Sequence, residues 1–183
     1  MQIKDLSIPD VKLIIPREYD DDRGSFAEIY IRKALEAAGI LESFVQDNAS
    51  RSINVGTIRG LHYQIPPYAQ AKLIRVSRGR IVDVAVDLRH SSPTYGKYVT
   101  AELSAENWSQ LYLPIGFAHA FCTLEPNTEV VYKVSSYYAP KAESGILWAD
   151  PDLAISWPVK NNEAILSEKD ARLPLFKEIQ AVF

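Results

Sequence analysis

The sequence is poor in the residues that most often carry metal or redox chemistry. Its 183 residues include one cysteine and three histidines. A single cysteine cannot form an internal disulfide, and Cys122 lies in the apolar run FCTL at residues 121–124. We therefore expect a packed, reduced thiol, which is typical of a cytoplasmic protein.

Long apolar runs and an excess of basic charge are also absent. No apolar run approaches the length of a transmembrane helix, and the first residues lack the apolar core of a signal peptide. The formal net charge of −3 argues against a broad nucleic-acid surface, which usually carries a basic patch. We therefore expect neither a membrane nor a nucleic-acid partner. A small anionic ligand is still allowed, because a few clustered arginines suffice to bind it.

Short β-branched and aromatic runs separated by turn signals dominate the chain. Residues 81–88 alternate between apolar and other side chains, and residues 98–103 and 129–134 are rich in strand formers. One clear helical pattern covers residues 31–38 and ends at Gly39. A second short helix is expected around residues 167–171, with Ser167 as its N-cap. The pattern predicts a single all-β domain over residues 1–183, a sandwich or barrel with few short helices.

The three histidines differ in their surroundings. His90 lies in a turn between strands, which predicts a solvated side chain, whereas His62 and His119 lie in apolar, strand-like segments next to glycine. A lone histidine in such a segment is more often a core residue than a catalytic one. Because Lys72 and Tyr132 also lie in strand-like segments, a shared site and a packed core are equally good interpretations of the residue types.

A metal site is the first chemistry to test. Small β-barrels often bind a metal through a His-x-His pair followed by a glutamate and a later histidine. Here the pair would be His62-Tyr63-Gln64, so the second ligand is an amide, and Lys72 stands where a carboxylate would follow. A protonated ammonium repels a divalent cation and offers no lone pair. We therefore expect no metal ion.

The same residue types suit proton abstraction next to a ketone. Such a reaction needs a base at the C–H, a positive group at the developing enolate oxygen and an acid that returns the proton. Histidine is a suitable base because imidazole titrates near neutral pH. Lysine can supply the charge and tyrosine the acid. A carboxylate on the second imidazole nitrogen would fix its tautomer.

Two side-chain directions stay open at this point. In a regular strand, Arg59 points away from His62, but a bulge at Gly60 would bring both to one face. Asp83 either points inward as a supporting group of the site or forms a salt bridge at the strand edge.

Several segments together resemble the dTDP-4-dehydrorhamnose 3,5-epimerase family, whose fold is a cupin-like jelly-roll barrel. The resemblance covers roughly residues 22–174. The similar segments are DRGSFAE at 22–28, FVQDN at 44–48, GTIRGLHYQ at 56–64, QAKL at 70–73, DVAVDLR at 83–89, LPIGFAH at 113–119, YK at 132–133, YAP at 138–140, WADPD at 148–152 and LSEKD at 166–170.

The resemblance implies a catalytic role for four residues. His62 matches the general base and Asp170 its partner, while Lys72 matches the lysine that stabilises the enolate and Tyr132 the general acid. Without the resemblance, Asp170 would be interpreted as a solvated carboxylate. The family needs neither a cofactor nor a metal.

The resemblance also implies binding roles. Arg23 and Arg59 match the arginines that hold the diphosphate, and Tyr138 matches an aromatic residue that stacks on the base, although Tyr137 is an alternative. Read without the resemblance, Arg23 would form a surface pair with the neighbouring aspartates. The further substrate-binding positions are Phe26, Glu28, Gln46, Asn48, His119, Glu143 and Lys169.

The implied activity is epimerisation at C3 and C5 of dTDP-4-dehydro-6-deoxy-D-glucose, which gives dTDP-4-dehydro-L-rhamnose for surface polysaccharides. The alternatives are an epimerase that acts only at C3 or only at C5, a ketoisomerase on the same barrel, and a non-catalytic sugar-nucleotide-binding protein. Family members are homodimers in which an N-terminal segment, here about residues 1–50, packs on the partner. One departure is Ala120, where the family commonly has glycine, and its methyl group could affect the position of His119.

Overall fold

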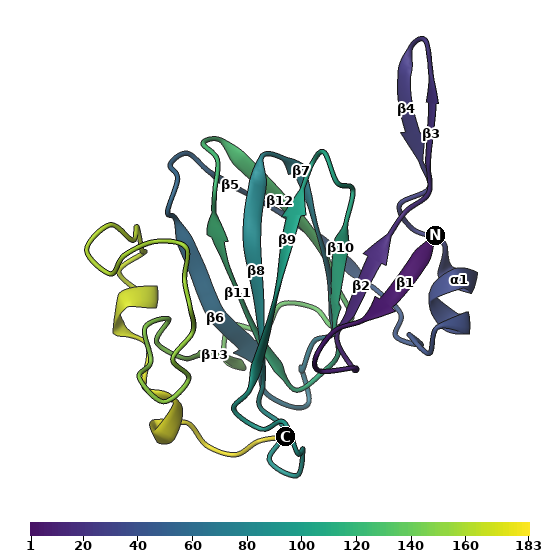
Figure 1. Cartoon of the computed structure of the whole chain (residues 1–183). Coiled ribbons are helices and arrows are strands. Elements are labelled where there is room, and N and C mark those ends of the chain that lie inside the picture. The colour runs from purple at the N-terminus through teal and green to yellow at the C-terminus, as the bar shows by residue number, and fades with distance from the viewer.

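Two antiparallel β-sheets face each other and form the body of the protein (Figure 1). The computed structural model describes all 183 residues. The larger sheet has the strand order β1-β2-β10-β7-β12-β5, and the smaller has the order β13-β6-β11-β8-β9. The larger sheet comprises β1 (Gln2–Asp5), β2 (Lys12–Ile15), β5 (Gln46–Ser52), β7 (Lys72–Arg78), β10 (Gln110–Leu113) and β12 (Thr128–Val134). The smaller comprises β6 (Ile58–Gln64), β8 (Arg80–Asp87), β9 (Tyr98–Ser104), β11 (Phe117–Thr123) and β13 (Glu143–Gly145).

The main core lies between the two sheets. Ile74 and Val130 come from the larger sheet, and Ile81, Val99 and Phe121 come from the smaller one; all five are buried in one cluster. Successive side chains of a strand point to opposite faces, so the alternating runs bury one face here. The strands predicted at residues 81–88, 98–103 and 129–134 are confirmed as β8, β9 and β12. The structure confirms the predicted all-β, cupin-like fold.

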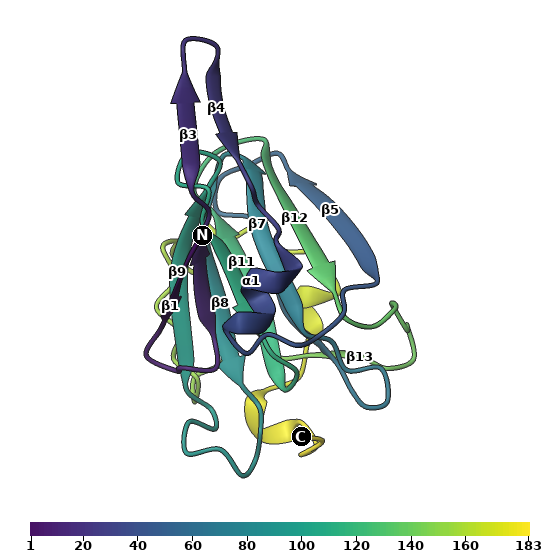
Figure 2. The same ribbon diagram turned by 90° about the vertical axis from the view of Figure 1, so that its right-hand side faces the viewer.

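Helix α1 (Arg32–Ala37) lies against the outer face of the larger sheet, as Figure 2 shows from the side. Its buried Leu35 packs with Ile40 against Leu73 of β7 and Tyr112 of β10. Gly39, with φ of +83°, adopts the left-handed conformation just after the helix, which glycine reaches without a steric penalty. The helix predicted at residues 31–38 is therefore confirmed.

The C-terminal segment covers the outer face of the smaller sheet (Figure 1). Trp157 and Phe176 pack against the cluster that holds Leu61 and Val84. The second predicted helix is a 3-10 turn, η1 (Asp170–Arg172), and Ser167 Oγ accepts a hydrogen bond from the backbone N–H of Asp170 at 3.0 Å. A further 3-10 turn, η2 (Phe176–Glu178), follows it.

The hairpin of β3 (Glu18–Asp21) and β4 (Gly24–Ala27) projects from the body, as both views show (Figures 1 and 2). Its two aromatic side chains, Tyr19 and Phe26, are 45% and 64% exposed. An isolated two-stranded hairpin is marginally stable in water, so its exposed aromatic rings indicate a surface that packs on something else.

None of the helices is long and apolar enough to span a lipid bilayer. Cys122 is free and buried, as the sequence predicts.

Candidate active site

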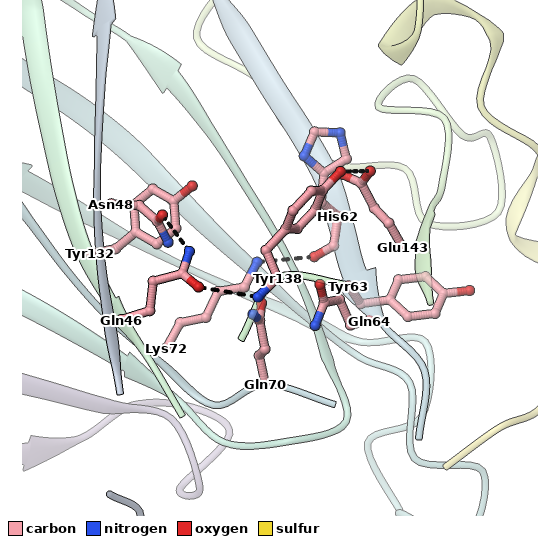
Figure 3. Close-up of a pocket in the computed structure, with 10 residues that line it drawn as sticks. All are labelled: Gln46, Asn48, His62, Tyr63, Gln64, Gln70, Lys72, Tyr132, Tyr138 and Glu143. Carbon is pink, nitrogen blue, oxygen red and sulfur yellow. Dashed lines mark hydrogen bonds between the residues drawn. The ribbon is translucent and has the colours of Figure 1, made fainter. Parts of the chain in front are cut away.

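A polar cleft opens between the two sheets, beside the apolar core. It consists of two cavities of about 290 and 410 Å³ that share His62, Lys72 and Tyr132 in their linings. Figure 3 shows the smaller of these two cavities, with Lys72 and Tyr132 on one wall and His62 on the other. His62 belongs to the smaller sheet and the other two residues to the larger sheet. The cleft therefore has chemically active groups on both walls.

His62 is paired with a carboxylate from the distant C-terminal segment. Its Nε2 lies 2.6 Å from Asp170 Oδ1, and the Asp170 side chain is almost fully buried. Burial raises the pKa of Asp170, but the hydrogen bond and charge of His62, together with hydrogen bonds from the Gly60 backbone and Ser167, outweigh it and the net pKa is lowered. The ionised carboxylate can only accept a hydrogen bond, so His62 Nε2 carries the proton and Nδ1 keeps the lone pair that a base needs.

A bulge in β6 brings Arg59 to the same side as His62. His119 pairs with His62 and Phe121 pairs with Arg59, so three steps along β6 oppose two along β11. Arg59 and His62 both line the larger cavity. The extra residue lies next to Gly60, whose φ is +117°. Arg59 and His62 therefore share a face, because a bulge at Gly60 interrupts the regular alternation of the strand.

Lys72 lies at the floor of the cleft and is buried. Its Nζ donates a hydrogen bond to the backbone oxygen of His62 at 3.3 Å. Burial lowers the pKa of Lys72 to about 8, and the negative charges of Asp83 and Glu143 oppose this shift. Lys72 is therefore mostly an ammonium at neutral pH, pointed at the cavity that His62 lines.

Tyr132 and Arg59 lie along the other parts of the larger cavity. Burial raises the pKa of Tyr132, while the Arg59 guanidinium acts in the opposite direction. Arg59 donates hydrogen bonds from Nε to Ser52 Oγ and from a terminal nitrogen to the backbone oxygen of Arg51, both at 3.1 Å. These bonds fix the guanidinium plane, which is the group that recognises phosphate in a bidentate manner.

His119 and Asp83 form a second, deeper contact. His119 Nε2 lies 2.8 Å from Asp83 Oδ1, and both side chains are buried. Asp83 therefore points inward, which decides between the two directions that the sequence left open. The methyl group of Ala120 belongs to the core cluster on the outer face of the smaller sheet, whereas His119 lines the cavity. Ala120 therefore does not crowd the cleft.

A chain of polar contacts forms the rim of the smaller cavity (Figure 3). Tyr138 Oη donates to Glu143 Oε2 at 2.8 Å, and Lys169 Nζ lies 2.5 Å from the same oxygen. Gln46 Nε2 donates to Asn48 Oδ1 at 2.8 Å, and Gln46 Oε1 accepts from the backbone N–H of Tyr138 at 3.1 Å. Four of these five residues line the cavity shown, and Lys169 lines the other one.

Two glutamines, Gln64 and Gln70, hold this rim in place, a role that their sequence positions do not indicate. Gln64 donates to the backbone oxygens of Tyr68 and Tyr137 and accepts from the N–H of Ala139. Gln70 donates to the backbone oxygen of Ser136 at 2.7 Å. Gln64 lies at the end of an apolar strand, which is a signal of a buried amide but not of its partners, whereas Gln70 lies in a loop. The rim loop is thus tied to β6, and Tyr138, not Tyr137, lines the cavity.

Three predicted site residues lie away from the cleft of their own chain. Arg23, Phe26 and Glu28 belong to the projecting hairpin or follow it, and none lines either cavity. The Arg23 guanidinium pairs with Asp21, and its side chain is 89% exposed.

No group of three or more histidine, cysteine, aspartate or glutamate side chains is arranged so that it could hold a metal ion. Next to His62, the amide of Gln64 is engaged with backbone groups, and Lys72 supplies a positive charge. The donor set of the cleft thus suits an anion better than a cation.

Comparisons with known proteins identify the family of this chain. The family model described as dTDP-4-dehydrorhamnose 3,5-epimerase matches residues 5–178. The dTDP-4-dehydrorhamnose 3,5-epimerase of Sinorhizobium fredii is 48% identical over 183 residues, which is 100% of this chain and 93% of the relative.

Two solved structures are similar in both sequence and shape. The enzyme of that name from Bacillus anthracis, determined with TDP and PPi bound, is 53% identical with a TM-score of 0.92 and 95% and 98% coverage of the two chains. The dTDP-6-deoxy-D-glucose-3,5-epimerase of Legionella pneumophila, in complex with dTDP-4-keto-L-rhamnose, is 44% identical with a TM-score of 0.93 and 98% and 95% coverage. This chain therefore belongs to the dTDP-4-dehydrorhamnose 3,5-epimerase family.

Proposed function

We propose that this chain converts dTDP-4-dehydro-6-deoxy-D-glucose into dTDP-4-dehydro-L-rhamnose by inverting C3 and C5. The observation that carries the proposal is the pair of opposite walls, with the His62–Asp170 pair on one and Tyr132 on the other. Inversion of a carbon needs proton removal from one face and proton return on the other. The relative in complex with dTDP-4-keto-L-rhamnose supports the identity of the substrate.

In the proposed mechanism, Nδ1 of His62 takes the proton from a carbon next to the C4 ketone. The C–H electron pair forms a C=C bond to C4, and the π electrons of the ketone move to its oxygen. The Lys72 ammonium stabilises the negative charge that develops on this oxygen. Tyr132 then gives its proton to the opposite face of the same carbon. Because C3 and C5 both flank the ketone, one set of groups serves both carbons once the sugar ring flips.

The diphosphate is proposed to lie on Arg59, whose guanidinium plane is fixed by Ser52 and the backbone of Arg51. Tyr138 at the rim is proposed to stack on the base, with Gln46 and Asn48 beside it. Glu143, Lys169 and His119 complete the proposed binding wall. No metal takes part in this proposal, because Lys72 supplies the charge at the enolate oxygen.

We further propose that the protein is a homodimer in which the β3–β4 hairpin enters the cleft of the partner. The exposed rings of Tyr19 and Phe26 support this, since they would be buried there. The hairpin would then deliver Arg23 to the diphosphate and Glu28 to the nucleotide. The free, buried Cys122 accords with a cytoplasmic setting for the reaction.

The test is to incubate the protein with dTDP-4-dehydro-6-deoxy-D-glucose in D₂O and locate deuterium by NMR. We expect label and inversion at both C3 and C5, with no effect of EDTA. Label at only one of the two carbons would identify a single epimerase, and absence of label at both would exclude the proposed activity on this substrate. The His62→Ala variant serves as the control and should show no exchange.

A further inference from the structure

Asp83 is a fully buried carboxylate whose one close polar contact is with His119. It lies in the middle of β8, paired with Phe121 on one side and Ala101 on the other. Its exposed fraction is 0%, and neither of its oxygens receives a hydrogen bond of good geometry. A buried charge of this kind is costly unless other charges compensate for it.

Asp87, on the same strand, shows what a structural aspartate looks like here. It is equally buried, but Arg89 donates two side-chain hydrogen bonds and one backbone hydrogen bond to it, and Ser92 and Thr94 add their hydroxyls. Asp83 has no comparable set of hydrogen-bond donors around it. Its position is therefore explained by the cleft side chains near it, His119 and Lys72, and not by the packing of the strand.

Two groups of the cleft face Asp83. His119 Nε2 lies 2.8 Å from its Oδ1 without the direction of a hydrogen bond. Lys72 reaches the same region from the opposite sheet, and Asp83 is the largest influence that opposes the loss of its charge. The other titratable groups near Lys72 are His62, His119, Tyr132 and Glu143, which come from β6, β11, β12 and β13.

We propose that Asp83 is a positioning residue, which holds Lys72 in its ammonium form and keeps the His119 proton on Nε2. This inference rests on the proposed function, because the ammonium matters only where an enolate oxygen must be stabilised. Asp83 does not touch the substrate in this arrangement. It acts through the two side chains that line the larger cavity.

The charge balance of the cleft supports the assignment. Burial lowers the pKa of His119, so this ring stays neutral and brings no full charge to Asp83. Asp170 is already paired with His62, and Glu143 with Lys169. Lys72 forms no ion pair of its own, and Asp83 is the buried carboxylate whose charge acts on it most strongly. A neutral residue at position 83 would leave the lysine buried with only Glu143, near the cleft rim, to favour its charge.

The primary experiment measures the pKa of Lys72 by NMR titration of the full-length protein, labelled with ¹³C-lysine and without substrate. The Lys72 signal is assigned with Lys72→Arg. We expect Asp83→Asn, which keeps the shape of the side chain, to lower the Lys72 pKa by about one unit or more. The matched control is Asp87→Asn, which removes an equally buried carboxylate of the same strand and should leave the Lys72 titration in place.

Turnover gives a second measurement. In Asp83→Asn, kcat/KM at pH 8 should fall about fivefold or more, and its alkaline limb should move to lower pH. A Lys72 titration that stays in place in Asp83→Asn would overturn the proposal, even if turnover falls. Because this titration needs no substrate, its outcome is independent of whether the proposed epimerase activity is found.

A measurement on the unaltered protein covers the case in which Asp83→Asn does not fold. ¹⁵N chemical shifts distinguish the two neutral imidazole tautomers, and we expect the Nε2–H form of His119 across pH 6 to 8. Finding the proton on Nδ1, or a charged ring at pH 8, would contradict the proposed role of Asp83.

Discussion

His62 Nε2 and Asp170 Oδ1 lie 2.6 Å apart, although 108 residues separate them in the chain. The ionised carboxylate fixes the tautomer in which Nδ1 can accept a proton. We expect Asp170→Asn to lower kcat by about 100-fold or more, because the amide can stabilise the wrong tautomer and does not favour the imidazolium. Steady-state kinetics should show this with little change in the melting temperature. A loss below about threefold would contradict the proposed pairing.

Tyr132 faces the cleft from the sheet opposite to His62. We expect Tyr132→Phe to block inversion but to retain some exchange, since His62 can still remove a proton and return a solvent deuteron to the same face. NMR in D₂O should therefore find label in the unchanged substrate and little epimerised product. Inversion at the normal rate would show that another group is the acid.

The buried position of Lys72 predicts an alkaline limit to activity. Burial lowers its pKa to about 8, so the ammonium is present below that pH and is lost as the pH rises through it. We expect kcat/KM to fall above about pH 8 with the loss of one proton. In Lys72→Arg the charge persists to much higher pH, so the alkaline limb should disappear, although the guanidinium geometry lowers the rate at neutral pH. An unchanged limb in this variant would assign it to another group.

Gly60 forms the bulge that turns Arg59 toward the cleft. Its φ is +117°, and a Cβ atom there would collide with the His119 backbone oxygen and with Ala120. We expect Gly60→Ala to destabilise the protein by about 3 kcal/mol, through the strained φ and the collision together. Urea unfolding measures this directly.

The matched control for Gly60 is Gly39→Ala. Gly39 also has a positive φ, but a Cβ there would meet nothing within 4 Å. We expect Gly39→Ala to lower the free energy of unfolding by only about 1 kcal/mol, because the positive φ is the one unfavourable feature there. Adding Ala120→Gly to Gly60→Ala should recover only a small part of the difference, because it removes the Ala120 Cβ but leaves the Ala120 Cα and the His119 oxygen in place. Equal losses at the two glycines would contradict the close packing at Gly60.

The proposed exchange of the hairpin predicts complementation between subunits. Arg23→Ala and His62→Ala should each abolish or strongly reduce activity. In a mixed dimer, one cleft would combine an intact His62 with the partner's intact hairpin. We therefore expect randomly mixed dimers to recover about a quarter of the wild-type rate, because half of them are mixed and each mixed dimer has one complete site. No recovery would indicate that Arg23 acts within its own chain or has no role.

The sequence determined the features that depend on neighbouring residues. Alternation over a few residues predicts strands because side chains of a strand point to opposite faces, and β8, β9 and β12 lie where that pattern indicates. Gly39 likewise predicted the end of α1, because glycine readily adopts the left-handed conformation that terminates a helix. The amide at Gln64 and the ammonium of Lys72 argued against a metal from residue types alone. The resemblance to the epimerase family, which many short segments carry, is confirmed.

The tertiary structure decided which distant groups meet. The sequence around Asp170 predicts only a solvated turn, because nothing local indicates that η1 packs beside β6 and buries the carboxylate against His62. Arg59 faces the cleft because a bulge breaks the strand period. Asp83 reaches His119 because β8 lies beside β11. These outcomes depend on how sheets pair and which face they bury, and both are fixed by long-range packing that no short segment contains.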